Sequence, residues 1–155
     1  HIVGDGSELN NLKKMAEEKN LSNVIFYGRK PSGEMPQYYA MADAMLVTLT
    51  ADRFISLTLP GKVQTYMAAG KPIIGAAVGE IPNVINAAKC GYCVNAEDAD
   101  GLAQAVRNFA VNKNRTQLGK NARSYYDQHF TREMFMNKLE RELNAYAEQG
   151  EEVTV

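Results

Sequence analysis

The sequence contains few of the residues that build metal centres and disulfide frameworks. Of its 155 residues, two are cysteine, two are histidine and none is tryptophan. Cys90 and Cys93 form one C-x-x-C pair, but a zinc site would need further ligands, and only His1 and His129 remain besides. The residues after Cys90 predict a strand, whereas a thioredoxin-type motif opens a helix. We therefore expect two reduced thiols in a cytoplasmic protein, with no metal site.

A strong net charge and long apolar runs are also lacking. The net charge is −1 at pH 7, which argues against nucleic acid or a broad anionic surface as a partner. No run of about 18 apolar residues is present to form a transmembrane helix, and we find no signal peptide. The chain begins at His1 and continues directly into the strand-like pair Ile2–Val3, so we expect an excised domain. Its composition, 45% hydrophobic and 23% charged, is typical of one globular domain.

Segments typical of strands and helices alternate along the chain. This alternation predicts an α/β fold, a Rossmann-like three-layer α/β/α domain with a parallel sheet of about five strands. The unbroken apolar run Ala44–Leu49 predicts a strand that is buried on both faces. The expected strands are residues 2–4, 24–27, 44–49, 72–76 and 92–94. The expected helices are residues 8–19, 33–42, 61–69, 82–88, 98–112, 115–129 and 131–149.

Helix caps and apolar stripes support several of these helices. Ser7 is a good N-cap for the first helix, Asp98 or Asp100 for the helix that ends near residue 112, and Thr131 for the last helix. The apolar stripe expected for residues 98–112 consists of Leu102, Ala105, Val106 and Phe109.

The most informative stretch is residues 58–74, where a Pro-Gly-Lys turn opens a short helix. The backbone N–H groups of Gly61, Lys62 and Val63 have no partners inside that helix, and they lie at the positive end of its dipole. Lys62 adds a full positive charge at the same place, so a phosphate or diphosphate is favoured there. The alternative is that Lys62 is an ordinary solvated lysine in a first helical turn.

Polar and glycine-rich loops follow the expected strands. Ligands of such sheets bind outside the carboxyl ends of the strands, so we expect the largest polar cleft at residues 4–7, 28–30, 53–62 and 79–80. Two alternatives stay open within these loops. The first glycines form only a tight turn or let a ligand approach the backbone, and Arg53 contacts the ligand or is simply solvated.

Two common phosphate-binding motifs are excluded. Residues 4–7 lack the third glycine of the dinucleotide fingerprint, and Arg29 rather than an acid follows the second strand, which excludes a nicotinamide-dependent dehydrogenase. A P-loop is excluded because Ser56 stands at its first glycine and Val63 follows Lys62 where Ser or Thr is required.

Five short motifs in order carry a resemblance to a known family: residues 2–6, 24–28, 38–44, 58–74 and 79–82. Together they resemble the nucleotide-sugar-binding half of GT-B-type retaining glycosyltransferases of group 1. Members of this family often read Pro-x-Lys, two residues, then Glu-Tyr-Met-Ala-x-Gly-x-Pro.

The resemblance implies that residues 1–150 are the C-terminal donor domain of such an enzyme, truncated at its N-terminal edge, with a flexible tail at 151–155. The full enzyme would move a sugar from a nucleoside diphosphate sugar, preferably UDP-linked, to a glycan or lipid-linked acceptor in surface polysaccharide biosynthesis. It would retain stereochemistry and need no metal or other cofactor. The expected substrate-binding residues are Gly4, Gly6, Gly28, Arg29, Arg53, Gly61, Lys62, Thr65 and Glu80.

The resemblance also implies a missing partner. The acceptor-binding N-terminal half would complete the enzyme and could hold it at the inner face of the membrane. A strand and turn that typically supply an arginine and a lysine for the diphosphate would also precede this chain. The terminal helix of these enzymes often crosses back over the N-terminal half, so we expect Phe135, Leu139 and Leu143 to be exposed here.

The chain departs from the family at two glutamates that are separated by seven residues. Leu57 and Thr65 stand in their places, so we assign no catalytic residue. The Pro-Gly-Lys-Val-Gln-Thr-Tyr series is similar to a subset that transfers amino-deoxy sugars, including L-fucosamine transferases. One alternative is a non-catalytic nucleotide-binding module with a degenerate site. Another is a GT-B-like epimerase, which would need acids and histidines that this chain lacks in its site.

Overall fold

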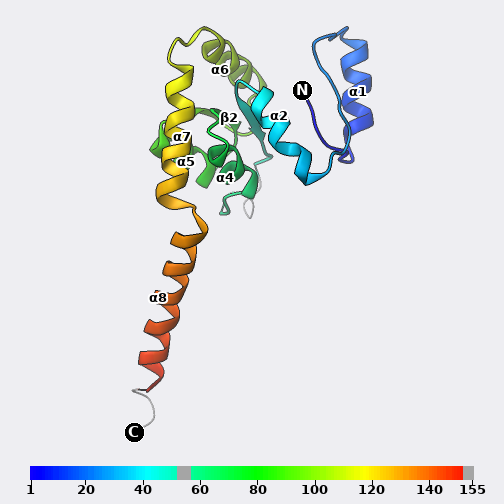
Figure 1. The fold of residues 1–155 in the computed structure, drawn as a ribbon. Helices are drawn as coiled ribbons and strands as arrows, with labels where there is room; N and C mark the ends of the chain where they lie inside the picture. The colour runs from blue at the N-terminus through cyan, green and yellow to red at the C-terminus, as the bar shows by residue number, and fades with distance from the viewer. Residues whose placement is uncertain (52–56, 152–155) are drawn as a thin grey trace. The chain divides into compact units, whose positions relative to one another are not determined.

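The computed structural model describes residues 1–51 and 57–151, and it divides the chain into two compact units (Figure 1). The first unit is His1–Met41 and the second is Ala42–Val155. Arg53 and Ser56 of the expected loop, and residues 152–155 of the expected tail, lie outside the described residues.

The first unit is built on one parallel bridge, between Ile2 and Phe26. The Ile2 N–H donates to the carbonyl of Ile25 at 2.8 Å, and the Tyr27 N–H donates to the carbonyl of Ile2 at 2.9 Å. Three helical segments complete the unit: α1 (Leu9–Glu18), the 3-10 turn η1 (Ser32–Glu34) and α2 (Met35–Met41).

The cap expected for the first helix is wrong. Glu8 occupies the N-cap position of α1 and makes no side-chain capping bond. Its carboxylate accepts instead from the Asn11 amide at 2.8 Å. Ser7 lies inside the preceding turn, which is closed by the bond from the Leu9 N–H to the carbonyl of Gly6 at 3.0 Å. The chain therefore enters the helix one residue later than the serine predicts.

The second unit contains a parallel three-stranded sheet in the order β1-β2-β3. The strands are β1 (Met45–Thr48), β2 (Ile73–Ala76) and β3 (Gly91–Val94). The helices of this unit are α4 (Gly61–Ala68), α5 (Glu80–Ala88), α6 (Ala99–Val111), α7 (Arg115–His129) and α8 (Arg132–Glu151).

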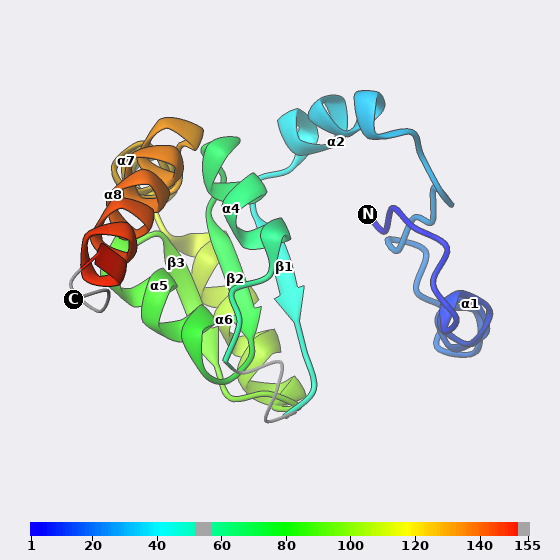
Figure 2. The same ribbon diagram turned by 90° about the horizontal axis from the view of Figure 1, so that it is seen from below.

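Helices cover both faces of this sheet, which gives the three layers expected from the sequence (Figure 2). Because successive side chains of a strand point to opposite faces, Ile73 and Ile74 of β2 belong to different layers. Ile73 packs with residues of α4, α5 and α7, whereas Ile74 packs with Ala105 and Phe109 of α6. All four residues of β2 are buried.

Two expectations about the sheet are wrong. The described residues form one sheet of three strands rather than about five, because the first two expected strands are reduced to the bridge of the first unit. The strand predicted to be buried on both faces, β1, lies at the edge of the sheet, and Leu46 is 55% exposed. Only Val47 of β1 is buried.

Two other helix caps are confirmed. The Asp98 carboxylate accepts from the Gly101 N–H at 2.8 Å at the start of α6, and the Thr131 hydroxyl accepts from the Met134 N–H at 3.3 Å at the start of α8. The expected stripe of α6 is confirmed only in part. Ala105 and Phe109 are buried, but Val106 is 41% exposed, because it turns away from the face that packs on β2.

A glycine lets α7 approach the end of α4 closely. A Cβ atom on Gly119 would lie 2.5 Å from the carbonyl oxygen of Gly70. The Arg123 guanidinium also donates to the carbonyl of Ala68 at 2.9 Å and forms an ion pair with Asp127 at 3.0 Å. The orientation of α4 on the sheet therefore depends on a contact between backbones.

We expect Gly119→Ala to destabilise the second unit. Alanine favours a helix over glycine by about 0.5 to 1 kcal/mol, but the clash with a backbone oxygen should cost about 1 to 3 kcal/mol. The free energy of unfolding, measured in urea, should therefore fall. Lys120→Ala, at the adjacent exposed position, is the matched control and should leave it nearly unchanged. A Gly119→Ala protein as stable as this control would contradict the close approach.

Candidate functional site

The amino end of α4 is exposed to solvent, while two apolar side chains of the same helix are buried in the core. Val63 and Met67 are fully buried in the main core, while Gly61 and Lys62 are exposed. Pro60 is the N-cap, with an extended backbone (φ −60°, ψ 137°) and no side-chain capping bond. Because Val63 and Met67 fix the helix in the core, Gly61 and Lys62 are left in contact with solvent.

Two backbone donors remain at this helix start. The Val63 N–H donates to the carbonyl of Pro60 at 2.9 Å, so the expectation that this group has no partner is wrong. Among the residues that the structure describes, no acceptor is found for the N–H groups of Gly61 and Lys62. The first turn of α4 contains no acidic residue, so the Lys62 ammonium adds to the positive end of the helix. This arrangement favours an anion.

Thr65 has its hydroxyl committed inside the helix. The Thr65 side chain donates to the carbonyl of Gly61 at 3.0 Å. The hydroxyl oxygen can still accept a hydrogen bond from a ligand, but its proton is used by the helix. Thr65 is therefore a weaker candidate for holding sugar hydroxyls than a glutamate at this position would be. Leu57, at the other glutamate position, is 74% exposed.

A second polar region lies at the carboxyl ends of β2 and β3. Gly79 has φ +79°, a backbone conformation that favours glycine, and is the N-cap of α5. Glu80 follows, exposed, and its carboxylate accepts from the Asn83 amide at 3.3 Å. A cavity of about 690 Å³ opens here. Its lining residues are Ala77, Val78, Gly79, Pro82, Asn83, Cys93, Val94, Asn95 and Asp98.

In the first unit the structure brings three of the predicted residues together. The Gly4 N–H donates to the carbonyl of Gly28 at 2.9 Å, and both glycines have positive φ, +148° and +67°. The Arg29 guanidinium lies 3.8 Å from the Asp5 carboxylate, and both side chains are largely exposed. The two turns after the bridged segments therefore meet, as the sequence predicts. Gly6 accepts from Leu9 in the turn before α1.

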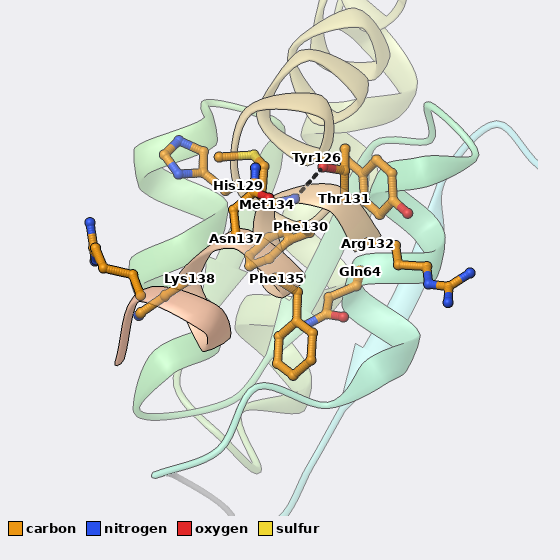
Figure 3. Close-up of a pocket in the computed structure, with 11 residues that line it drawn as sticks. Gln64, Tyr126, His129, Phe130, Thr131, Arg132, Met134, Phe135, Asn137 and Lys138 are labelled. Atoms are coloured by element: carbon orange, nitrogen blue, oxygen red, sulfur yellow. Dashed lines mark hydrogen bonds between the residues drawn. The ribbon is translucent and has the colours of Figure 1, made fainter. Parts of the chain in front are cut away.

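A further cavity lies outside the loops in which we expected the polar cleft. It has a volume of about 960 Å³ and lies between α4, the end of α7 and the start of α8 (Figure 3). Gln64 lines it from α4 and Tyr126 from α7, while Phe130 lines it from the junction of α7 and α8 and Phe135 from α8. The expected lining residues are instead divided between two units and residues outside the described chain.

This cavity was missed because its residues carry no motif. Their aromatic side chains are typical of helix packing, and only the exposed side chains of α8 gave a signal. Phe135, Leu139 and Leu143 are 64%, 40% and 59% exposed, which confirms the expected exposed apolar face of the terminal helix.

The two cysteines are free, and burial makes them poor ligands and nucleophiles. Burial raises the pKa of the Cys90 thiol to about 11 and also raises the pKa of Cys93. Both thiols are therefore protonated at neutral pH. No group of three metal-ligating side chains occurs among the described residues. None of the described helices is long and apolar enough to span a membrane.

The second unit is a parallel sheet that helices cover on both faces, and the amino end of α4 is exposed beside it. This architecture defines a Rossmann-like α/β protein. The model of the family Glycosyl transferases group 1 matches residues 1–125, and the chain belongs to this family. The resemblance of its motifs to that family is thereby confirmed.

Two curated relatives illustrate the family membership. The chain is 28% identical over 141 residues to N-acetyl-alpha-D-glucosaminyl L-malate synthase of Bacillus anthracis, covering 90% of this chain and 35% of that protein. It is 28% identical over 118 residues to a GDP-mannose-dependent alpha-(1-6)-phosphatidylinositol monomannoside mannosyltransferase of Mycobacterium tuberculosis, covering 74% of this chain and 30% of that protein. The chain thus spans about a third of the length of these relatives.

A solved structure supports the fold. The chain superposes on Anabaena Alr3699/HepE in complex with UDP with a TM-score of 0.77 at 19% sequence identity. The match covers 92% of this chain and 40% of that protein. At this level of identity the similarity establishes the Rossmann-like α/β fold alone.

We expect the buried Cys90 thiol to make stability depend on pH in the alkaline range. Its folded pKa is about 11 against an ordinary value of 9.0, so below pH 9 both states are protonated and stability is unaffected. As pH rises from 9 to 11, only the unfolded state loses the proton, and roughly 2 to 3 kcal/mol of stability should be lost. Urea unfolding at several pH values measures this. Cys90→Ala should show a shallower fall, and an equal slope would contradict the assignment.

Proposed function

We propose that this chain is the donor-binding domain of a glycosyltransferase that moves a sugar from a nucleoside diphosphate sugar to an acceptor. The observation that carries the proposal is the exposed amino end of α4 in a member of this family. There the N–H groups of Gly61 and Lys62 find no acceptor among the described residues, and Lys62 adds its charge. A diphosphate fits this site because it offers both charge and several acceptor oxygens.

In the proposed reaction the chain stabilises the leaving group. Charge grows on the nucleoside diphosphate as the bond to the sugar breaks. The N–H groups of Gly61 and Lys62 and the Lys62 ammonium are held in place before the reaction, so they stabilise this charge without reorganising. The proposal assigns no residue of this chain as a general base and requires no metal or other cofactor.

We propose that further residues of each unit contact the nucleoside diphosphate sugar. In the first unit, backbone approach at the turns containing Gly4, Gly6 and Gly28 and the charge of Arg29 are proposed to serve the nucleotide. In the second unit, Arg53, Thr65 and Glu80 complete the set. The positive φ of Gly4 and Gly28 supports the first part, because a turn without side chains lets a ligand approach the backbone.

UDP is the proposed nucleotide. It is supported by the UDP bound to the similar Anabaena protein, while the name of the mycobacterial relative specifies GDP-mannose. The proposed sugar is an amino-deoxy sugar of the L-fucosamine type, supported by the series from Pro60 to Tyr66. Calorimetric titration of the chain with UDP, GDP and ADP tests the nucleotide, and tighter binding of GDP or ADP would refute UDP.

The proposed partner is an acceptor-binding half in the rest of a longer protein. The chain spans about a third of the length of its curated relatives, and α8 presents exposed apolar side chains at Phe135, Leu139 and Leu143. We propose that this half covers α8 and binds a glycan or lipid-linked acceptor in surface polysaccharide biosynthesis. A cytoplasmic enzyme at the inner face of the membrane fits such an acceptor.

A non-catalytic nucleotide-binding module is the second candidate. The presence of Leu57 and Thr65 at the two glutamate positions favours it, because neither side chain supplies a carboxylate for the sugar or ribose hydroxyls. Turnover of a UDP-sugar by the longer protein separates the two candidates. A protein that binds UDP but turns over none of the common UDP-sugars would favour the module.

We expect Lys62→Ala to weaken UDP binding about fivefold to tenfold, because a charge-assisted bond to phosphate is lost at a site that solvent partly screens. Uridine binding should hardly change, since the nucleoside has no anion. Calorimetry with both ligands measures the difference. Lys120→Ala, an exposed lysine of α7, is the matched control. Equal UDP affinities of the wild type and Lys62→Ala would show that Lys62 is only a surface lysine.

We expect residues 1–155 alone to transfer no sugar, because the acceptor is proposed to bind to the other part of the enzyme. The longer protein should release UDP from its donor in the presence of acceptor, and the isolated chain should not. A coupled assay for UDP release, run on both proteins at equal concentration, checks this. Sugar transfer by the isolated chain would refute the proposal that the donor and the acceptor bind to different parts of the enzyme.

A further inference from the structure

Two glycines form the contact between α7 and the turn that ends α4. Gly70, in this turn, has φ +65°, and its N–H donates to the carbonyl of Met67 at 2.9 Å. Gly119 of α7 is buried, and a Cβ atom on it would lie 2.5 Å from the Gly70 carbonyl oxygen and 3.5 Å from Pro72. Since an ordinary contact begins at 3.4 Å, a side chain on Gly119 would push the two backbones apart by roughly 1 Å.

The helix that would yield to such a clash is α4. It has 8 residues, and its buried side chains are Val63 and Met67. Helix α7 has 15 residues and is also held at the end of α5, where the Asn121 amide donates to the carbonyl of Lys89 at 2.9 Å. If the two backbones are forced apart, the shorter helix therefore moves.

A shift of α4 carries its amino end with it. A helix of about two turns moves as one body, because its backbone hydrogen bonds join each turn to the next. Gly61 and Lys62 would therefore move by a comparable distance. Hydrogen bonds to a bound phosphate are made at about 2.9 Å and are lost beyond about 3.5 Å, so a shift of roughly 1 Å breaks them. The start of α4 thus depends on the packing at its other end.

We infer that Gly119 is a positioning residue for the proposed donor site. The absence of a side chain there sets the position of α4, and with it the position of the Gly61 and Lys62 N–H groups. Gly119 lies near the opposite end of α4 from these groups and acts on them through the helix. The inference rests on the proposal that a diphosphate binds at the start of α4, and it adds a residue that none of the proposed contacts includes.

Calorimetric binding of UDP and uridine to two variants of the chain tests the inference. Gly119→Ala introduces the clash. Gly70→Ala is the matched control, because its Cβ atom would lie at an ordinary 3.8 Å from its neighbours, while the positive φ still lowers its stability. We expect Gly119→Ala to weaken UDP binding about threefold to tenfold and Gly70→Ala to leave it nearly unchanged. Uridine should bind equally to both. Equal UDP affinities of the two variants would overturn the inference.

Amide signals of the ligand-free proteins give a second test. A shift of α4 changes the surroundings of the Gly61 and Lys62 amides, so their NMR signals should move in Gly119→Ala and keep their positions in Gly70→Ala. A loss of stability alone would not move them. Unchanged signals in Gly119→Ala would show that α7 yields instead of α4 and would overturn the inference.

A second substitution serves if Gly119→Ala does not fold. Ala122 of α7 is fully buried in the cluster that contains Val63 and Met67 of α4. Ala122→Val adds two methyl groups to this layer and should displace α4, with the same effects on UDP binding and on the amide signals. A folded Ala122→Val protein that binds UDP as tightly as the wild type would overturn the inference.

The two measurements separate this inference from the proposed function. Displaced Gly61 and Lys62 signals in Gly119→Ala, together with a wild-type chain that binds no UDP, would refute the proposed function and support the dependence of α4 on Gly119. Equal UDP binding by the wild type and Gly119→Ala would support the proposed function and overturn the inference.

Discussion

The burial of β2 on both faces is the constraint on which the second unit depends. Ile73 and Ile74 point to opposite sides, so one short strand requires α4, α5 and α7 on one face and α6 on the other. Parallel neighbours on both sides satisfy its backbone. Because β2 can be covered only when the segments before and after it return to the sheet, its burial fixes the order of the layers.

The candidate site is a consequence of that burial. Val63 and Met67 fix α4 on the sheet, and the helix begins where its buried face ends, so Gly61 and Lys62 are left in solvent. The positive end of the helix is thus placed by apolar packing rather than by polar contacts. At the other end of α4, Gly119 of α7 lets the two backbones approach each other closely at the Gly70 carbonyl.

The second unit exposes several large apolar side chains on its regular elements. Leu46 on β1 and Phe135, Leu139 and Leu143 on α8 are large apolar side chains in exposed positions on regular elements. Proteins seldom leave such side chains in contiguous sets on the surface without a partner. The chain spans about a third of the length of its curated relatives.

The sequence by itself determined the alternation of strands and helices, the family, and most helix limits, because periodicity and caps such as Asp98 and Thr131 act within a few residues. It also placed Gly61 and Lys62 at a helix start. Only the tertiary structure decided that β1 is an edge strand, that Thr65 bonds to its own helix, and that a cavity of about 960 Å³ lies beside α7 and α8. These features depend on which segments meet in space, and the apolar run Ala44–Leu49 does not itself specify whether its strand lies inside the sheet or at the edge.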